Sequence, residues 1–240
     1  MILDAARDLL VTEGISIGLG NITFKRVFDH LEATSGVRVT HSSVIERIWR
    51  DQDEFHLAVI DSVLNLTVPD DPLFERSIRR MIAVAETADR TIPEGRWEAM
   101  FEIARVGAAD NLKLLQRYVW WPLWLNVWTW LATGEDGEGA SDLRRAVRSN
   151  YRASDAIYEA LYGGLMDYLG FRVKDGFTLH DMDTMFAWSA EGAAIRQRVD
   201  PDALKARRFR GKMWTPLGLA FRGIVIQALE LIPDWEPSEA

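Results

Sequence analysis

Apolar residues recur three and four positions apart through almost the whole of this 240-residue chain. In the clearest example, residues 142–169, an apolar or aromatic side chain returns at nearly every third or fourth position. This spacing places side chains on one face of an α-helix, whereas the alternation typical of a half-buried strand is scarce. The pattern predicts an all-α fold, with helices near 2–11, 22–31, 40–49, 52–64, 73–90, 94–108, 111–133, 142–169, 179–199 and 217–231.

Capping residues indicate where several of these helices begin. Asp71 followed by Pro72 is a good helix start, because proline fits the first helical position, where its missing N–H is not needed. Asp51 can cap the helix that contains Phe55, and either Thr40 or Ser43 can cap the short helix before it. The segments 133–141 and 198–216 are rich in glycine, proline or charge and are predicted to be loops.

The absence of cysteine limits both chemistry and location. Disulfides, thiolate metal sites and cysteine nucleophiles are excluded, and the composition suits a reducing cytosol. No signal peptide is visible, and the most apolar stretch, Tyr118–Ala132, is too short and too polar to span a bilayer. These features predict a cytoplasmic protein that has no membrane partner.

A cluster of small hydroxyl residues stands out within "GVRVTHSSVIERIWRDQDEF", residues 36–55. Such residues at the start of a helix let the backbone approach DNA closely and donate hydrogen bonds to bases or phosphates. The net charge of −8 argues weakly against a general nucleic-acid binder but is compatible with a local basic patch. Residues 23–50 contain five basic residues and only three acids.

The first sixty residues resemble the TetR family of bacterial transcription regulators. The segment "ILDAARDLLVTEGI" is similar to the first helix of that family, "ITFKRVFDHLEA" to the second, "VTHSSVIERIW" to the recognition helix and "RDQDEFHLAVIDSVL" to the start of the fourth. The resemblance implies a helix-turn-helix domain over residues 1–50, a connecting helix over 51–66, and an effector-binding and dimerisation domain over 67–240. It also implies that a homodimer binds operator DNA as a repressor and that a small apolar or aromatic effector modulates this binding.

The resemblance and the hydroxyl cluster together indicate which residues contact DNA. Two positions depart from the family pattern: Ile45 or Glu46 stands where a tyrosine is common, and Gln52 where a lysine is common. The alternative is therefore a small-molecule-binding or protein-interaction dimer whose DNA-binding module has decayed. The predicted DNA contacts are Thr23, Lys25, Arg26, Arg38, Thr40, His41, Ser42, Ser43, Arg47 and Arg50.

Tryptophans are concentrated in the segment 118–132. They are either core residues or the aromatic wall of a cavity for a flat or apolar effector. Pro122 within a helix over 111–133 removes one backbone hydrogen bond, so a kink is expected there. The family places its ligand in the middle helices, so the predicted ligand contacts are Trp97, Phe101, Arg105, Arg117, Trp120, Trp121, Trp124 and Trp128.

Two apolar stripes, over 142–169 and 217–231, would be core in a monomer. In the family, the corresponding helices pair with their copies in a four-helix interface, and a palindromic operator also requires a twofold axis. The interface is predicted at Tyr151, Tyr158, Leu161, Leu165, Phe221, Ile224 and Ala228.

Catalytic motifs are absent from the sequence, so neither an enzyme nor a cofactor is predicted. His180, Asp181 and Asp183 could suggest a metal site, but acids at a predicted helix start are favoured by the helix dipole anyway. The basic segment 205–212 is interpreted as a solvated loop or, alternatively, as a contact for an anionic effector such as a coenzyme A thioester.

Overall fold

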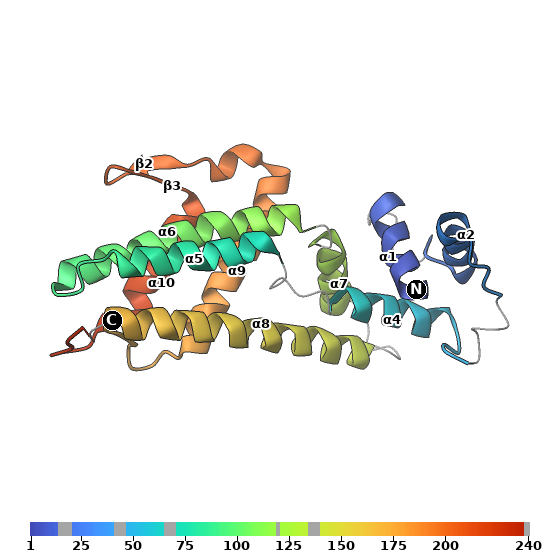
Figure 1. Cartoon of the computed structure of the whole chain (residues 1–240), viewed down its shortest axis with the longest axis horizontal. Helices are drawn as coiled ribbons and strands as arrows, with labels where there is room; N and C mark the ends of the chain where they lie inside the picture. Colours follow the sequence, from blue (N-terminus) through green and yellow to red (C-terminus); the bar gives the residue numbers. More distant parts are fainter. Residues whose placement is uncertain (14–20, 41–46, 65–70, 119–120, 134–139, 238–240) are drawn as a thin grey trace. The chain divides into compact units, whose positions relative to one another are not determined.

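The computed structural model describes residues 1–13, 21–40, 47–64, 71–118, 121–133 and 140–237, and helices dominate these segments. The prediction of a mostly helical fold is therefore confirmed. No helix in these ranges combines the length and the apolarity that a membrane crossing requires. The helices are α1 (Ile2–Glu13), α2 (Phe24–Ser35), α4 (Gln52–Leu64), α5 (Pro72–Glu86), α6 (Pro93–Arg117), α7 (Trp121–Thr133), α8 (Ala140–Leu169), α9 (Leu179–Val199) and α10 (Pro216–Ala228), all labelled in Figure 1.

The chain divides into two compact units. The N-terminal unit comprises residues 1–67 and 118–151, and the second unit comprises residues 68–117 and 152–240. This division differs from the predicted domains, because residues 118–151 group with the N-terminal residues rather than with the rest of the expected effector domain.

In the N-terminal unit, α1 packs against both α2 and α4. Thr23 caps α2 by accepting a hydrogen bond from the Arg26 N–H, and Asp51 caps α4 by accepting one from the Glu54 N–H at 2.8 Å. Each helix turns an apolar face inward, as the spacing predicts. The buried side chains are Ala5, Ala6, Leu9 and Leu10 on α1, Val27, Phe28 and Leu31 on α2, and Phe55, Val59, Ile60 and Val63 on α4.

The second unit is built around α6, which packs against α5, α9 and α10 (Figure 1). Asp71 caps α5 and Pro72 occupies its first turn, as predicted. A short antiparallel pair, β1 (Phe171–Val173) and β4 (Leu229–Leu231), joins the segments that follow α8 and α10. Leu169, Phe171 and Leu229 are almost completely buried around this pair, so it belongs to the core of the unit.

The predicted helix break between residues 108 and 111 is wrong, because α6 runs without interruption from Pro93 to Arg117. Asp110 lies at the expected break, where an aspartate side chain can end a helix by binding backbone N–H groups. Instead its carboxylate is only 1 % exposed and binds Arg80 of α5 at 2.6 Å and Lys113 at 3.4 Å. A buried carboxylate that is satisfied by two cations no longer competes for the backbone N–H groups of the helix.

The predicted kink at Pro122 is also wrong. The helix expected over 111–133 is two helices, and Pro122 is the second residue of α7. A proline in the first turn removes no intrahelical hydrogen bond, so the chain starts a new helix there instead of bending an existing one.

Three further predictions differ from the structure. The expected loop 198–216 contains a 3₁₀ turn (Pro201–Leu204) and a hairpin of β2 (Arg207–Phe209) and β3 (Lys212–Trp214). The last helix ends at Ala228, because residues 229–231 form β4 and their backbone pairs with β1. The helix expected over 73–90 likewise ends earlier, at Glu86, with Thr87 as its C-cap.

Candidate functional sites

The segment predicted to contact DNA is attached to the N-terminal unit at both ends. Gly36 ends α2 in the left-handed conformation (φ 70°), and its N–H donates to the Glu32 carbonyl at 2.9 Å. At the other end Trp49 is buried, with its ring centroid 4.9 Å from that of Phe55 and 6.2 Å from that of Phe24. The hydroxyl-rich stretch therefore runs between two fixed points.

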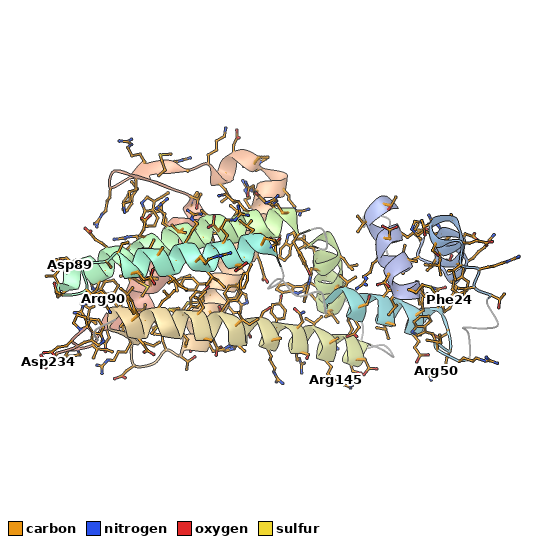
Figure 2. All side chains as sticks on the ribbon, viewed as in Figure 1. Phe24, Arg50, Asp89, Arg90, Arg145 and Asp234 are labelled. Carbon is orange, nitrogen blue, oxygen red and sulfur yellow. The ribbon has the colours of Figure 1, made fainter. Side chains whose placement is uncertain are left out.

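Trp49 and Phe55 both lie in the core of this unit. Phe24, at the start of α2, stacks on Phe55 at 4.6 Å, so the three rings form one aromatic cluster. Figure 2 labels Phe24 on this unit. Three rings in edge and stacked contact fix the ends of α2 and α4 and the Trp49 backbone more firmly than aliphatic contacts of the same area would.

The predicted basic contacts are mostly exposed. Lys25, Arg38 and Arg47 face solvent, and so does Arg50, which is 82 % exposed and pairs with Glu54 at 3.3 Å. Arg26 is half-buried and donates to the Asn21 carbonyl at 3.0 Å. Thr23 serves as a helix cap and Thr40 is exposed, whereas His41, Ser42 and Ser43 lie outside the described residues.

Gln52, which stands where the family commonly has a lysine, has a structural role here. Its side-chain amide donates to the Ile22 carbonyl at 2.9 Å and accepts from the Phe24 N–H at 3.1 Å. The same amide nitrogen lies 2.9 Å from Nε2 of His56. Gln52 thus joins the first turn of α4 to the first turn of α2, which sequence reasoning did not find.

The tryptophans of α7 lie within the N-terminal unit. Trp121 and Trp124 are buried, whereas Trp128 is 37 % exposed. Trp124 and Trp128 both contact the ring of Tyr151, with centroids 5.6 and 5.8 Å away. Trp120 lies outside the described residues.

The other predicted ligand contacts pack on the outer side of α6. Trp97 stacks on Phe101 at 5.4 Å and meets Phe171 edge-on at 4.7 Å. Arg105 pairs with Glu102, whose pKa is lowered to about 2 by hydrogen bonds from Arg105 and Lys212 that outweigh its burial. Arg117 is exposed.

An apolar cavity of about 50 Å³ lies inside the second unit. One water needs about 10–15 Å³ measured in this way, so the cavity can admit a small ligand group. None of the predicted ligand contacts lines it. Its walls come from α5, α6, α8, α9 and α10 and include Phe74, Met81, Met100, Ile103, Gly107, Asn111, Tyr158, Tyr162, Leu165, Met166, Met182, Phe186, Phe221 and Val225.

Four methionines and one helical glycine distinguish this lining. Methionine is unbranched and adapts its shape, so a wall containing it can close around ligands of different outline. A Cβ on Gly107 would lie 3.0 Å from the Met81 sulfur. Glycine at this position therefore gives the Met81 side chain room in the cavity wall. Methionines recurring near a mid-helix glycine are the signal that could have indicated this cavity from the sequence.

A buried carboxyl group lies beside the tyrosines of this wall. Asp183 is 3 % exposed, and burial together with the charges of Asp155 and Glu159 raises its pKa to about 7. Burial also raises the pKa values of Tyr158 and Tyr162, and the nearby Asp183 adds to both shifts.

His180 lies at the exposed edge of this acidic group. Its Nδ1 is 2.9 Å from a Glu159 oxygen, and that hydrogen bond raises the pKa of the imidazole. Asp181 accepts hydrogen bonds from the hydroxyl and the N–H of Thr178 and so completes a capping box at the start of α9, as a helix-start acid is expected to do.

Three of the seven predicted interface residues are buried within the single chain, and the interface itself stays a prediction. Leu165, Phe221 and Ala228 are at most 6 % exposed, and the Tyr158 ring packs edge-on against Phe74 at 5.6 Å. Leu165, Phe221 and Tyr158 line the cavity, and Tyr158 is half-buried. Tyr151, Leu161 and Ile224 are half-buried.

No family model, no curated protein and no solved structure matches this chain significantly. The likeness to TetR-family regulators therefore rests on the residues of the first sixty positions alone.

Proposed function

We propose that this protein is a ligand-responsive DNA-binding transcription regulator of the TetR type, acting as a homodimeric repressor. The N-terminal unit would bind operator DNA, and the second unit would hold a small apolar effector. No catalytic constellation is invoked, because both tasks are binding tasks.

The observation that carries the proposal is the fixed position of both ends of the segment 36–50. Gly36 ends α2, and Trp49 is buried between Phe24 and Phe55. A helix-turn-helix needs its second helix held rigidly against the first, with its N-terminal end free to enter the major groove. The exposed side chains of Arg38 and Arg47 flank that end and would contact phosphates.

The cavity supports the effector half of the proposal. Its lining is mostly aliphatic, methionine and aromatic, with the amide of Asn111 and the two tyrosine hydroxyls as the polar groups that would orient a ligand. The factor by which an effector lowers operator affinity cannot exceed the ratio of its own affinities for the weakly and the strongly DNA-binding conformations.

The exposed face of α9 supports the dimer. Trp188 is 66 %, Ile195 42 % and Val199 77 % exposed, and with Gly192 they recur at intervals of four, three and four residues. Such a stripe faces a second helix in coiled-coil-like packing. We place the interface there rather than at the buried positions of α8 and α10.

Binding to the DNA upstream of the gene tests the function. The wild type should shift this fragment at nanomolar to micromolar concentration in a gel-shift experiment. The variant Arg47→Ala/Arg50→Ala should bind all DNA sequences more weakly, because phosphate contacts are independent of sequence. A wild type that binds no fragment better than an unrelated duplex would exclude the regulator.

Sedimentation tests the interface separately. Trp188→Lys with Ile195→Lys should give monomers, because two charges cannot be buried in an apolar seam. Ile82→Lys, at a position 38 % exposed on α5, is the matched control and should remain a dimer. A wild type that sediments as a monomer at micromolar concentration would contradict the dimer.

A further inference from the structure

The hairpin β2–β3 carries a concentration of positive charge that neither the DNA-binding segment nor the cavity uses. Residues 205–212 contain five basic side chains and no acid, in a chain of net charge −8. Two of these cations are neutralised, since Lys205 pairs with Asp202 at 2.8 Å and Lys212 with Glu102 at 2.9 Å. Arg207, Arg208 and Arg210 form no ion pair with any described residue.

Arg210 adopts a backbone conformation that disfavours it. The hairpin closes through two residues, Arg210 (φ 47°) and Gly211 (φ 80°), between the paired Phe209 and Lys212. Tight hairpins of this kind favour asparagine, aspartate or glycine at the first turn position, because a larger side chain is strained at positive φ. Strained residues that persist in a fold concentrate at binding sites.

The guanidinium groups of Arg210 and of a second arginine, Arg222, both lie near the ring of Phe209. The Cζ of Arg210 is 5.6 Å from the centroid of the Phe209 ring, and the Cζ of Arg222 on α10 is 5.7 Å from the same centroid. Arg222 also lies 4.2 Å from the Phe101 ring. Burial and the charge of Arg210 lower the pKa of Arg222, as expected for two cations held together without a counter-ion.

The carboxylate that pairs with Lys212 of this hairpin is already engaged. Glu102 binds both Arg105 and Lys212. Neither Arg210 nor Arg222 forms an ion pair within the described ranges of the chain. Two arginines on one aromatic ring, one of them partly buried, repel each other unless an anion lies between them.

We propose that Arg210 and Arg222 bind the phosphate group of a small molecule at the β2–β3 hairpin. Paired guanidinium groups match the oxygens of a phosphate through several parallel N–H···O bonds. The ring of Phe209, 37 % exposed, offers an aromatic face beside that group. This site is separate from the cavity and does not depend on the regulator function.

Calorimetric titration of the full chain tests this site. Inorganic pyrophosphate is the first ligand and ADP the second, both at constant ionic strength. The wild type should bind at least one of them, and Arg222→Gln should weaken that binding about tenfold or more, because the remaining arginine cannot form the paired contact. If ADP binds more tightly than pyrophosphate, the ligand is a nucleotide-like ester rather than free phosphate. The site is supported whichever of the two binds more tightly.

Arg210→Gly separates binding from folding. Glycine relieves the positive φ, so this variant should melt about 2–4 °C above the wild type while losing anion affinity. A loss of affinity in a more stable protein cannot come from unfolding.

Arg208→Gln is the matched control. It removes the same charge from the hairpin, but Arg208 pairs across the strands with Met213 and so lies on the face opposite Phe209. It should change affinity less than about threefold, as expected for a screened, distant charge. Equal losses in Arg208→Gln and Arg222→Gln, or no binding of either ligand to the wild type, would overturn the proposal.

Discussion

The two units of this protein have cores of different character. The N-terminal unit is fixed by large aromatic rings in direct contact, with Phe55 completely buried between Phe24 and Trp49. The second unit buries methionines and tyrosines around an apolar cavity of about 50 Å³. The core of the N-terminal unit consists of aromatic rings in close contact, whereas the core of the second unit contains an unfilled cavity.

This difference corresponds to the two tasks that we propose. A DNA-contacting segment must be held in one position, and rigid aromatic packing does this at low entropic cost. An effector site needs space and adaptable walls, and the methionine-lined cavity supplies both. The following predictions test whether the two cores respond to substitution as this contrast requires.

The largest effect is expected from Phe55→Ala. Removing a fully buried ring leaves a cavity between Phe24 and Trp49, so the free energy of unfolding should fall by about 3–5 kcal/mol. Denaturant titration measures this change. The comparison variant is Met166→Leu in the cavity wall, which conserves volume and should cost less than about 1.5 kcal/mol. If both variants lose the same free energy of unfolding, the two cores do not differ in the way proposed.

The next largest effect is expected from Asp183→Asn, and it should depend on pH. Because the pKa of Asp183 is raised to about 7 in the folded protein, its protonated form contributes stability at low pH. That stability is lost as the pH rises from about 4, the unfolded value, through 7. Asparagine does not titrate, so the variant should be more stable than the wild type at pH 8, by at most about 4 kcal/mol.

Melting curves from pH 4 to 8 check this prediction. The difference between the two curves reports the Asp183 carboxyl group together with its coupling to Asp155 and His180, which face it. A difference that stays constant over this range would show that Asp183 is ionised throughout.

A smaller effect is expected from Gln52→Ala. The substitution leaves the Phe24 N–H without its side-chain partner and the Ile22 carbonyl with only the ring nitrogen of His56, so stability should fall by about 1–3 kcal/mol. Thermal unfolding measures the change. Gln52→Glu can still accept from Phe24 but cannot donate to Ile22, and it should therefore lose an intermediate amount. If Gln52→Ala leaves stability unchanged, Gln52 is free to contact DNA instead.

The smallest effect is expected from Gly107→Ala. Alanine favours the helix by about 1 kcal/mol, and part of this gain is offset because the Met81 sulfur, 3.0 Å from the new Cβ, must shift. The displaced Met81 side chain should occupy part of the cavity. Toluene, used as an apolar probe, should therefore raise the melting temperature of this variant less than that of the wild type.

Gly164→Ala on α8 is the control for that variant. A Cβ there meets nothing within 4 Å, so it should give the full helix gain and leave the toluene response unchanged. If the two alanine variants respond alike to toluene, the cavity does not hold the probe.

The sequence predicted the helices and their caps well, because these depend on local spacing and on single residues such as Asp51 and Asp71. It failed where tertiary contacts decide. Asp110 stays within α6 because Arg80 of another helix neutralises it, and residues 229–231 form a strand because β1 lies beside them. Neither partner can be inferred from neighbouring residues.

The candidate sites show the same limit. Arg47 is exposed, as a DNA contact requires, and Trp49 is buried, but residues 47–50 do not continue the helix that the sequence predicted there. The cavity was predicted around Trp121 and Trp124, since aromatic residues in a middle helix suit a pocket. Its position in the second unit depends on how five helices pack, which the composition of any one helix does not specify.

The salt dependence of DNA binding tests the central claim most directly. Fluorescence anisotropy with the upstream fragment, between 50 and 200 mM salt, gives the slope of log affinity against log salt. For a dimer whose Arg47 and Arg50 side chains contact phosphates, the wild-type slope should be steeper than that of Arg47→Ala/Arg50→Ala by about 3–4 units, since each lost phosphate contact removes about 0.9. Identical slopes for the two proteins would contradict the claim that the segment held between Gly36 and Trp49 binds DNA.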